Sequence, residues 1–126
     1  MYQQDWIMRQ IQMLVQFIAK LVWGKDTIEY QVTEQENLSE TDLLYYEIER
    51  LLAHSQICEA EDLLFEQLDG SNNKYLELAI DFYQKINKLS DKDLENANFS
   101  REEIENGLKE IMKLFGLSDF TFLHLG

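Results

Sequence analysis

The sequence predicts an all-α protein, and three observations carry this prediction. The 126 residues include no proline and only five glycines, so little in the chain interrupts a helix. Apolar side chains recur at intervals of three and four residues over most of the length, which is the spacing of one helix face. Helix-start patterns, such as Ser100 with Glu103, separate these stretches. We expect antiparallel helical hairpins in a tetratricopeptide-like array or an irregular bundle, with a long apolar helix at the N-terminus.

The length and the hydrophobic content of 45% suit one folded domain. We expect a single helical domain over residues 1–126. Its four parts are an N-terminal helix (1–24), a linker with a partial helical turn (25–40), helical hairpins (41–116) and an extended tail packed on the helices (117–126).

The N-terminal helix is predicted from about Gln3 to Trp23, and its apolar surface is unusually broad. The central face consists of Ile7, Ile11, Leu14, Val15, Ile18, Leu21 and Val22. Trp6, Met13 and Phe17 widen this face on one side, and Met8 and Ala19 widen it on the other. A helix with so wide an apolar arc must be covered on more than one side.

Residues 41–116 are expected to form the remaining helices, separated by polar turns. The predicted helices cover about 41–54, a stretch ending near 69, 74–89, a short segment to 97, and a last helix from Ser100 to Gly116. The starts near 41 and 73 lie about 32 residues apart, close to the tetratricopeptide spacing of about 34. The full small-and-large signature of that repeat is missing, so tandem hairpins without repeat ancestry remain the alternative.

The opening residues resemble a known kind of protein. The segment Asp5-Trp6-Ile7-Met8-Arg9-Gln10-Ile11, followed by Gly24-Lys25-Asp26, is similar to the start of a family of small uncharacterised bacterial helical proteins. The resemblance implies a bacterial, cytoplasmic protein with a tetratricopeptide-like body. It implies no activity.

The formal net charge of −13 is large for this size and is unevenly distributed. Residues 1–25 carry three basic side chains and one acidic, whereas residues 26–126 carry eight basic and twenty-three acidic. The overall charge argues against nucleic-acid binding, because phosphates would be repelled. A basic partner stays open, as does mimicry of nucleic acid. The basic N-terminal helix also suits docking on its own acidic body.

Residues able to carry catalysis are scarce. His54 and Cys58 are four positions apart, but a turn is expected between them and no third orienting residue is apparent. We interpret them as a surface histidine and a structural cysteine. The acidic run from Glu102 to Glu105 lies in the first turn of a helix, where the helix dipole favours negative charge. We therefore expect no enzyme activity.

Cofactor and metal motifs are also missing from the sequence. No glycine-rich phosphate loop occurs, and the loop 69–73 fails the calcium-loop pattern because its glycine comes second. No paired spacing typical of zinc ligands occurs around His54 and Cys58. We expect no cofactor and no metal. The lone cysteine and the lack of a signal-peptide pattern favour a cytoplasmic location.

The leading hypothesis for function is a non-enzymatic protein–protein interaction module or a homo-oligomer. Adjacent tyrosines on the second helix cannot both face one core, so one of them is a candidate to line a groove. The candidate partner-binding residues are Trp6, Met13, Phe17, Trp23, Tyr45 and Tyr46.

Two alternatives use other properties of the chain. The basic amphipathic first helix, with a tryptophan near each end, could anchor the protein on a membrane surface. The acidic remainder could instead inhibit a basic partner.

Overall fold

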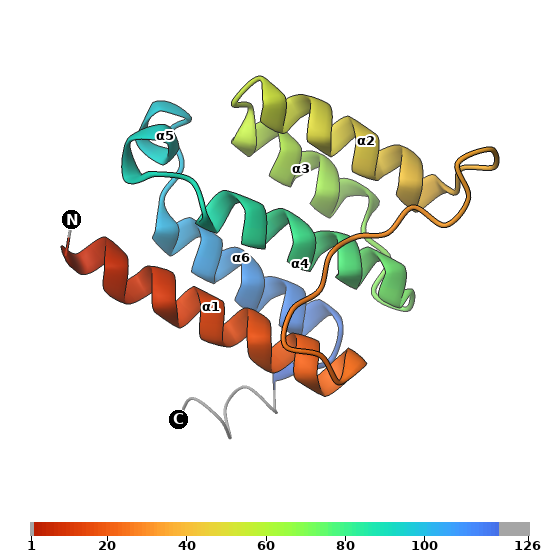
Figure 1. The fold of residues 1–126 in the computed structure, drawn as a ribbon, viewed down its shortest axis with the longest axis horizontal. Helices are drawn as coiled ribbons and strands as arrows, with labels where there is room; N and C mark the ends of the chain where they lie inside the picture. The colour runs from red at the N-terminus through yellow and green to blue at the C-terminus, as the bar shows by residue number, and fades with distance from the viewer. Residues whose placement is uncertain (1, 119–126) are drawn as a thin grey trace.

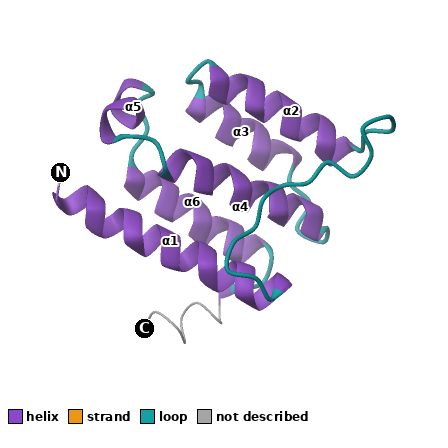
Figure 2. Ribbon diagram, viewed as in Figure 1, coloured by secondary structure: helices purple, strands orange, loops and turns teal. Residues whose placement is uncertain are grey.

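The structure is a computed structural model that describes the backbone of residues 2–118 and the side chains of residues 5–118. Every regular element in this part is a helix, which confirms the all-α prediction (Figure 2). The elements are α1 (Tyr2–Trp23), α2 (Glu40–Ala53), α3 (Ile57–Gln67), α4 (Asn73–Asn87), α5 (Asp91–Asn96) and α6 (Arg101–Leu114). Residues 119–126 of the predicted tail lie outside the described residues.

Helix α4 forms the centre of the fold. It contacts α1, α2 and α6, and ten of its fifteen residues are buried. Figure 1 shows α1 and α6 running in one direction and α4 in the other, with the α2–α3 hairpin on the opposite side of α4 from α1. The adjacent Phe82 and Tyr83 are both buried, and their rings meet edge to face at 4.9 Å between centroids.

Two successive hairpins account for most of this architecture. The first is α2–α3, and the second is α4–α6 with the short α5 inserted between its arms (Figure 1). Helix α2 also contacts α4, so the two hairpins lie side by side. The finer expectation of a tetratricopeptide-like arrangement is not tested by this and stays a prediction.

Capping side chains, which the sequence pattern predicts, set the starts of several helices. Ser39 and Asp42 form a reciprocal capping box at α2, and Ser100 and Glu103 form another at α6. Ser90 caps α5. Each cap satisfies backbone N–H groups that have no partner inside the helix, which is why these local patterns place the helices well.

Helix α1 lies at one edge of the fold and buries its central face against α4 and α6. The buried residues of α1 are Ile7, Ile11, Leu14, Val15, Ile18 and Ala19. The helix ends at Gly24, whose φ of +69° lies in the left-handed region that favours glycine. Two helices therefore cover the inward arc, while part of the predicted apolar surface stays exposed.

The segment between α1 and α2 differs from the predicted linker. Residues 24–39, which we call the strap, contain a turn at Glu34–Asn37 but no helical turn. Ile28 and Tyr30 are buried in the hydrophobic core. The strap therefore crosses the surface of α4 as a packed part of the fold (Figure 1).

Candidate functional site

The outer face of α1 carries the most exposed large apolar side chains of the N-terminal helix. Trp6 is 63% exposed, Met13 58% and Leu21 41%. Seven residues are close to two full turns, so Trp6 and Met13 lie on the same side of the helix, whereas Leu21 lies about 80° further round, next to the buried face. We call these three residues the α1 seam.

A shallow hollow of about 610 Å³ lies along the second half of the seam. Met13 and Leu21 line it together with Gln16, Lys20 and Asp26. Phe17 contributes to its wall but is half-buried and packs against the core. Lys20 and Asp26 form an exposed ion pair of 3.3 Å at its rim. The hollow thus combines an apolar floor with a charged edge, as partner surfaces do.

The sequence and the structure differ on which residues of α1 are accessible. Trp6 and Met13 were predicted as candidates, and both are exposed. Trp23 is half-buried and packs against the core. Leu21 was assigned to the inward face by its periodicity but is exposed, because α4 and α6 cover an arc that stops short of it. Helical spacing alone cannot locate the edge of such an arc.

The two candidate tyrosines of α2 contact each other edge to face, with ring centroids 5.4 Å apart, but they differ in exposure. Tyr45 stacks on Tyr30 of the strap with ring centroids 4.8 Å apart, and Lys85 lies 5.0 Å above its ring. Tyr46 is 44% exposed, next to the exposed Leu43. Helices α1 and α2 lie on opposite sides of α4 (Figure 1), so the fold does not join these tyrosines to the α1 seam.

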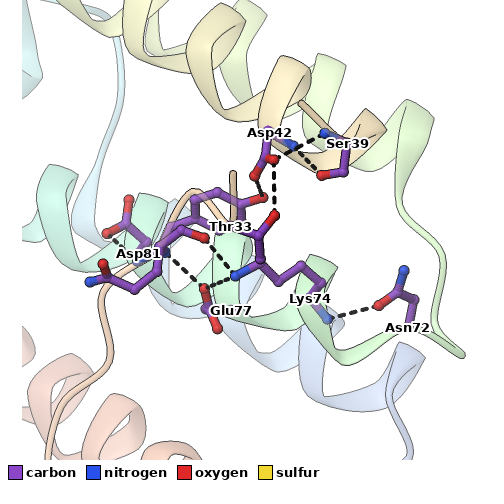
Figure 3. A network of polar contacts seen from close by, with 9 residues as sticks. Thr33, Ser39, Asp42, Asn72, Lys74, Glu77 and Asp81 are labelled. Carbon is purple, nitrogen blue, oxygen red and sulfur yellow. Dashed lines mark hydrogen bonds and ion pairs between the residues drawn. The ribbon is translucent and has the colours of Figure 1, made fainter. Parts of the chain in front are cut away.

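Asp42 anchors the strap to the start of α2 (Figure 3). Its carboxylate accepts hydrogen bonds from the Tyr30 hydroxyl at 2.6 Å, the Thr33 hydroxyl at 3.3 Å and the Ser39 N–H at 3.0 Å. Burial alone would raise the pKa of Asp42, but these hydrogen bonds outweigh it and hold the pKa below its usual value. The same burial and the nearby carboxylate raise the pKa of Tyr30. Asp42 is therefore an ionised structural anchor.

Two carboxylates of α4 hold the middle of the strap. Asp81 accepts the Tyr30 N–H at 3.1 Å and pairs with Lys85 at 2.8 Å. Glu77 accepts the Gln31 N–H at 2.9 Å and pairs with Lys74 at 2.7 Å. The carboxylates of Asp81 and Glu77 thus each accept a hydrogen bond from a strap N–H group and pair with a lysine. The network in Figure 3 is therefore suited to holding the strap backbone in place.

The cluster of Asp42, Asp81 and Glu77 was not identified from the sequence. Asp81 and Glu77 lie on α4 and Asp42 lies on α2, and the strap links them. The two α4 carboxylates bond strap N–H groups that are 51 and 46 residues away in the sequence, whereas Asp42 is 12 residues from Tyr30. The only sequence signal was the isolated pair of large apolar residues, Ile28 and Tyr30, within a polar stretch.

His54 and Cys58 do not form a catalytic pair. The His54 ring nitrogen lies 2.9 Å from the carbonyl oxygen of Arg50, whereas the Cys58 thiol faces the carbonyl oxygen of Asn98 at 3.7 Å. Burial and nearby carboxylates raise the pKa of the Cys58 thiol, which opposes formation of a nucleophilic thiolate. Among the described residues, no group of three or more His, Cys, Asp or Glu side chains is arranged to hold a metal ion.

Arg101 is a further buried group that the sequence did not single out. Its guanidinium donates to the carbonyl oxygens of Asn87 and Leu89, both at 2.7 Å, and pairs with Asp91 at 3.0 Å. These bonds join the end of α4 to the starts of α5 and α6. The side chain is therefore a clamp between helices.

A comparison with known protein families identifies the family to which the chain belongs. The model of a family of unknown function, DUF6483, matches residues 1–116. The chain belongs to this family. The resemblance to an uncharacterised family is thus confirmed, and the match extends beyond the N-terminal segment that suggested it to all six helices of the described part.

No function is assigned to DUF6483, and no curated protein or solved structure matches the chain. None of the helices within the described residues has the length and apolar character needed to cross a membrane.

Proposed function

We propose that this protein is a non-enzymatic protein–protein interaction module whose binding surface is the α1 seam. The observation that carries the proposal is the exposure of Trp6, Met13 and Leu21 on a helix whose central face is buried. Large apolar side chains aligned on a rigid element are typical of binding surfaces.

The buried face of α1 supports this reading because it makes the seam rigid. Ile11 and Ile18 have no exposed surface, so the helix is held firmly on α4 and α6. Little side-chain or backbone freedom is then lost when a partner binds.

The test is affinity capture from a lysate of cells that produce the protein, comparing the wild type with Met13→Glu. Met13 is exposed, so the substitution leaves the core intact, whereas a charge at Ile11 or Ile18 would unfold the helix. Gln67→Glu adds the same charge on the exposed end of α3 and serves as the control. We expect a protein recovered with the wild type and the control but not with Met13→Glu.

Equal recovery by all three proteins would contradict the assignment of the seam. Circular dichroism of each variant ensures that a loss of binding is not a loss of folding.

Attachment to a membrane surface is the alternative use of the same helix. It is favoured by the exposed Trp6 beside the exposed Arg9. The structure supports it less well, because α4 and α6 already bury the central apolar face that an interfacial helix would insert. Sedimentation with anionic liposomes at low salt separates the two: binding that Met13→Glu abolishes would favour the membrane.

Three finer properties belong to the same proposal. We propose a cytoplasmic location from the lone cysteine, the lack of a signal-peptide pattern and the resemblance of the N-terminal segment, and a bacterial origin from that resemblance alone. We also propose that the paired hairpins α2–α3 and α4–α6 are tetratricopeptide-like. Their side-by-side contact through α2 and α4 supports this last point.

A further inference from the structure

We propose that the occupant of the α1 seam is a second copy of this chain, bound with its α1 antiparallel to the first. The inference rests on the proposed function and names its partner. The two helices would be related by a two-fold axis close to Met13.

Measured along the helix axis, the seam is nearly symmetric about Met13. Trp6 precedes Met13 by seven residues and Leu21 follows it by eight, which correspond to about 10 and 12 Å along a helix. In an antiparallel pair, Trp6 of each copy therefore meets Leu21 of the other, and the two Met13 side chains meet at the centre. A two-fold interface requires this kind of self-complementary surface.

The charges beside the seam select the antiparallel direction. Asp5 is adjacent to Trp6, and Lys20 is adjacent to Leu21. Lys20 pairs with Asp26 within one chain, but both side chains are exposed, so Lys20 can exchange this partner. Antiparallel pairing brings Asp5 of each copy towards Lys20 of the other, whereas parallel pairing would set Lys20 against Lys20 and Arg9 against Arg9. Like charges in register are unfavourable, so the direction follows from them.

The overall charge favours α1 over other surfaces for self-association. Two copies that each carry a net charge of −13 repel one another. Residues 1–25 are a net basic region on an otherwise acidic chain, and α1 lies at the edge of the fold opposite the α2–α3 hairpin. Contact through α1 therefore keeps the acidic bodies of the two copies apart.

The seam spans one helix, so the interface is small. A helix of 22 residues is about 33 Å long, and a single helix pair buries less surface than a permanent dimer does. We therefore expect reversible association, with a dissociation constant on the order of micromolar. Because the association is apolar and opposed by net charge, it should strengthen as salt is added.

Site-directed cross-linking tests the register, since Cys58 is the only cysteine. In a Cys58→Ser background, Met13→Cys treated with a short bifunctional maleimide should form a covalent dimer. Trp6→Cys and Leu21→Cys should cross-link poorly alone but efficiently when mixed. Gln67→Cys, exposed on α3, is the control.

Two cross-linking results would overturn the proposal. One is a yield for Met13→Cys no higher than for the control. The other is efficient self-cross-linking of both Trp6→Cys and Leu21→Cys, which would indicate parallel helices.

Sedimentation equilibrium of the full-length chain tests the association itself. The wild type should shift from monomer to dimer with concentration. Met13→Glu should raise the dissociation constant roughly tenfold or more, whereas Gln12→Glu, exposed on the other flank of α1, should change it by less than about threefold.

A wild type that stays monomeric over the whole concentration range would refute the second copy as partner. The capture experiment then decides the proposed function separately. A different protein captured through Met13 would leave the interaction module standing, and no capture would remove both.

Discussion

Asp42, Asp81 and Arg101 show how single residues carry charge in the interior of this protein. Each is at most 4% exposed and is hydrogen-bonded to backbone groups as well as to side chains. Burying a charge without such partners would cost several kcal/mol. These residues therefore specify where the strap and the end of α4 must lie. Removing one partner should destabilise the protein by more than the net free energy of one hydrogen bond, because the remaining group stays buried without a partner.

Gly107 is needed because the Tyr83 hydroxyl occupies the space of a side chain. A Cβ atom at this position would lie 2.1 Å from Tyr83 Oη, and Tyr83 is itself fixed by a hydrogen bond to Glu61 at 2.5 Å. Gly107→Ala should therefore destabilise the protein by about 1–3 kcal/mol, although alanine favours helices by up to about 1 kcal/mol over glycine. Urea unfolding measures the change. Asn106→Ala, on the exposed side of α6, should be neutral or stabilising, and a stable Gly107→Ala variant would contradict the packing described.

The Glu61 carboxyl should make the stability of the folded protein depend on pH. Burial raises its pKa, as do the neighbouring Glu103 and Asp62, while the Tyr83 hydroxyl opposes the shift. A carboxyl whose pKa is raised on folding stabilises the protein fully below its ordinary pKa, and this contribution is lost as pH rises through the folded value. Glu61→Gln keeps an acceptor for Tyr83 without the charge, so it should be more stable than the wild type near pH 8.

That advantage should disappear as the pH falls towards about 4, where Glu61 is protonated in the wild type. Thermal unfolding of both proteins across this range measures the difference. Glu66→Gln, exposed on the same helix, is the control and should show no comparable trend. A difference that grows on acidification would have the wrong sign and would refute the raised pKa.

Among the elements, the strap is the one whose structure depends most on distant parts of the chain. Helices α2, α4, α5 and α6 begin at side-chain caps, and apolar periodicity reveals the buried faces of the longer helices, so their positions were predicted to within a few residues. The strap has neither caps nor a period. Its order comes from α4 carboxylates that accept its N–H groups and from burial of Ile28 and Tyr30.

Removing the Tyr30 hydroxyl tests the strap as an element. Tyr30→Phe keeps the stack on Tyr45 but deletes the hydrogen bond to Asp42, so it should cost about 1–3 kcal/mol in urea unfolding. Amide hydrogen exchange should be slow at Tyr30 and Gln31 in the wild type and faster in the variant. Tyr46→Phe on the exposed part of α2 is the control. Equal exchange in the two proteins would show that the hydrogen bond from Tyr30 to Asp42 is not needed to order the strap.

For the whole molecule, the net charge of −13 makes stability sensitive to salt. Repulsion among the acidic side chains disfavours the compact state, and salt screens it within about 10 Å at 0.1 M. The melting temperature should therefore rise by a few degrees as sodium chloride increases from about 0.01 to 0.5 M. Calorimetry at low protein concentration measures this effect without association. A falling melting temperature would mean that the attractive ion pairs, such as Lys74–Glu77, outweigh the repulsion.

The sequence by itself determined the helical class, the helix starts and most of the core, because propensity, capping and apolar spacing act over a few residues. It also predicted Trp6 and Met13 as accessible candidates, since they flank the central face of α1. Only the tertiary structure decided that Leu21 is exposed, that Tyr45 belongs to the strap contacts and that Asp42, Asp81 and Glu77 lie together. Those outcomes depend on which helix covers which arc and on contacts across 40 or more residues, and local periodicity contains no information about either.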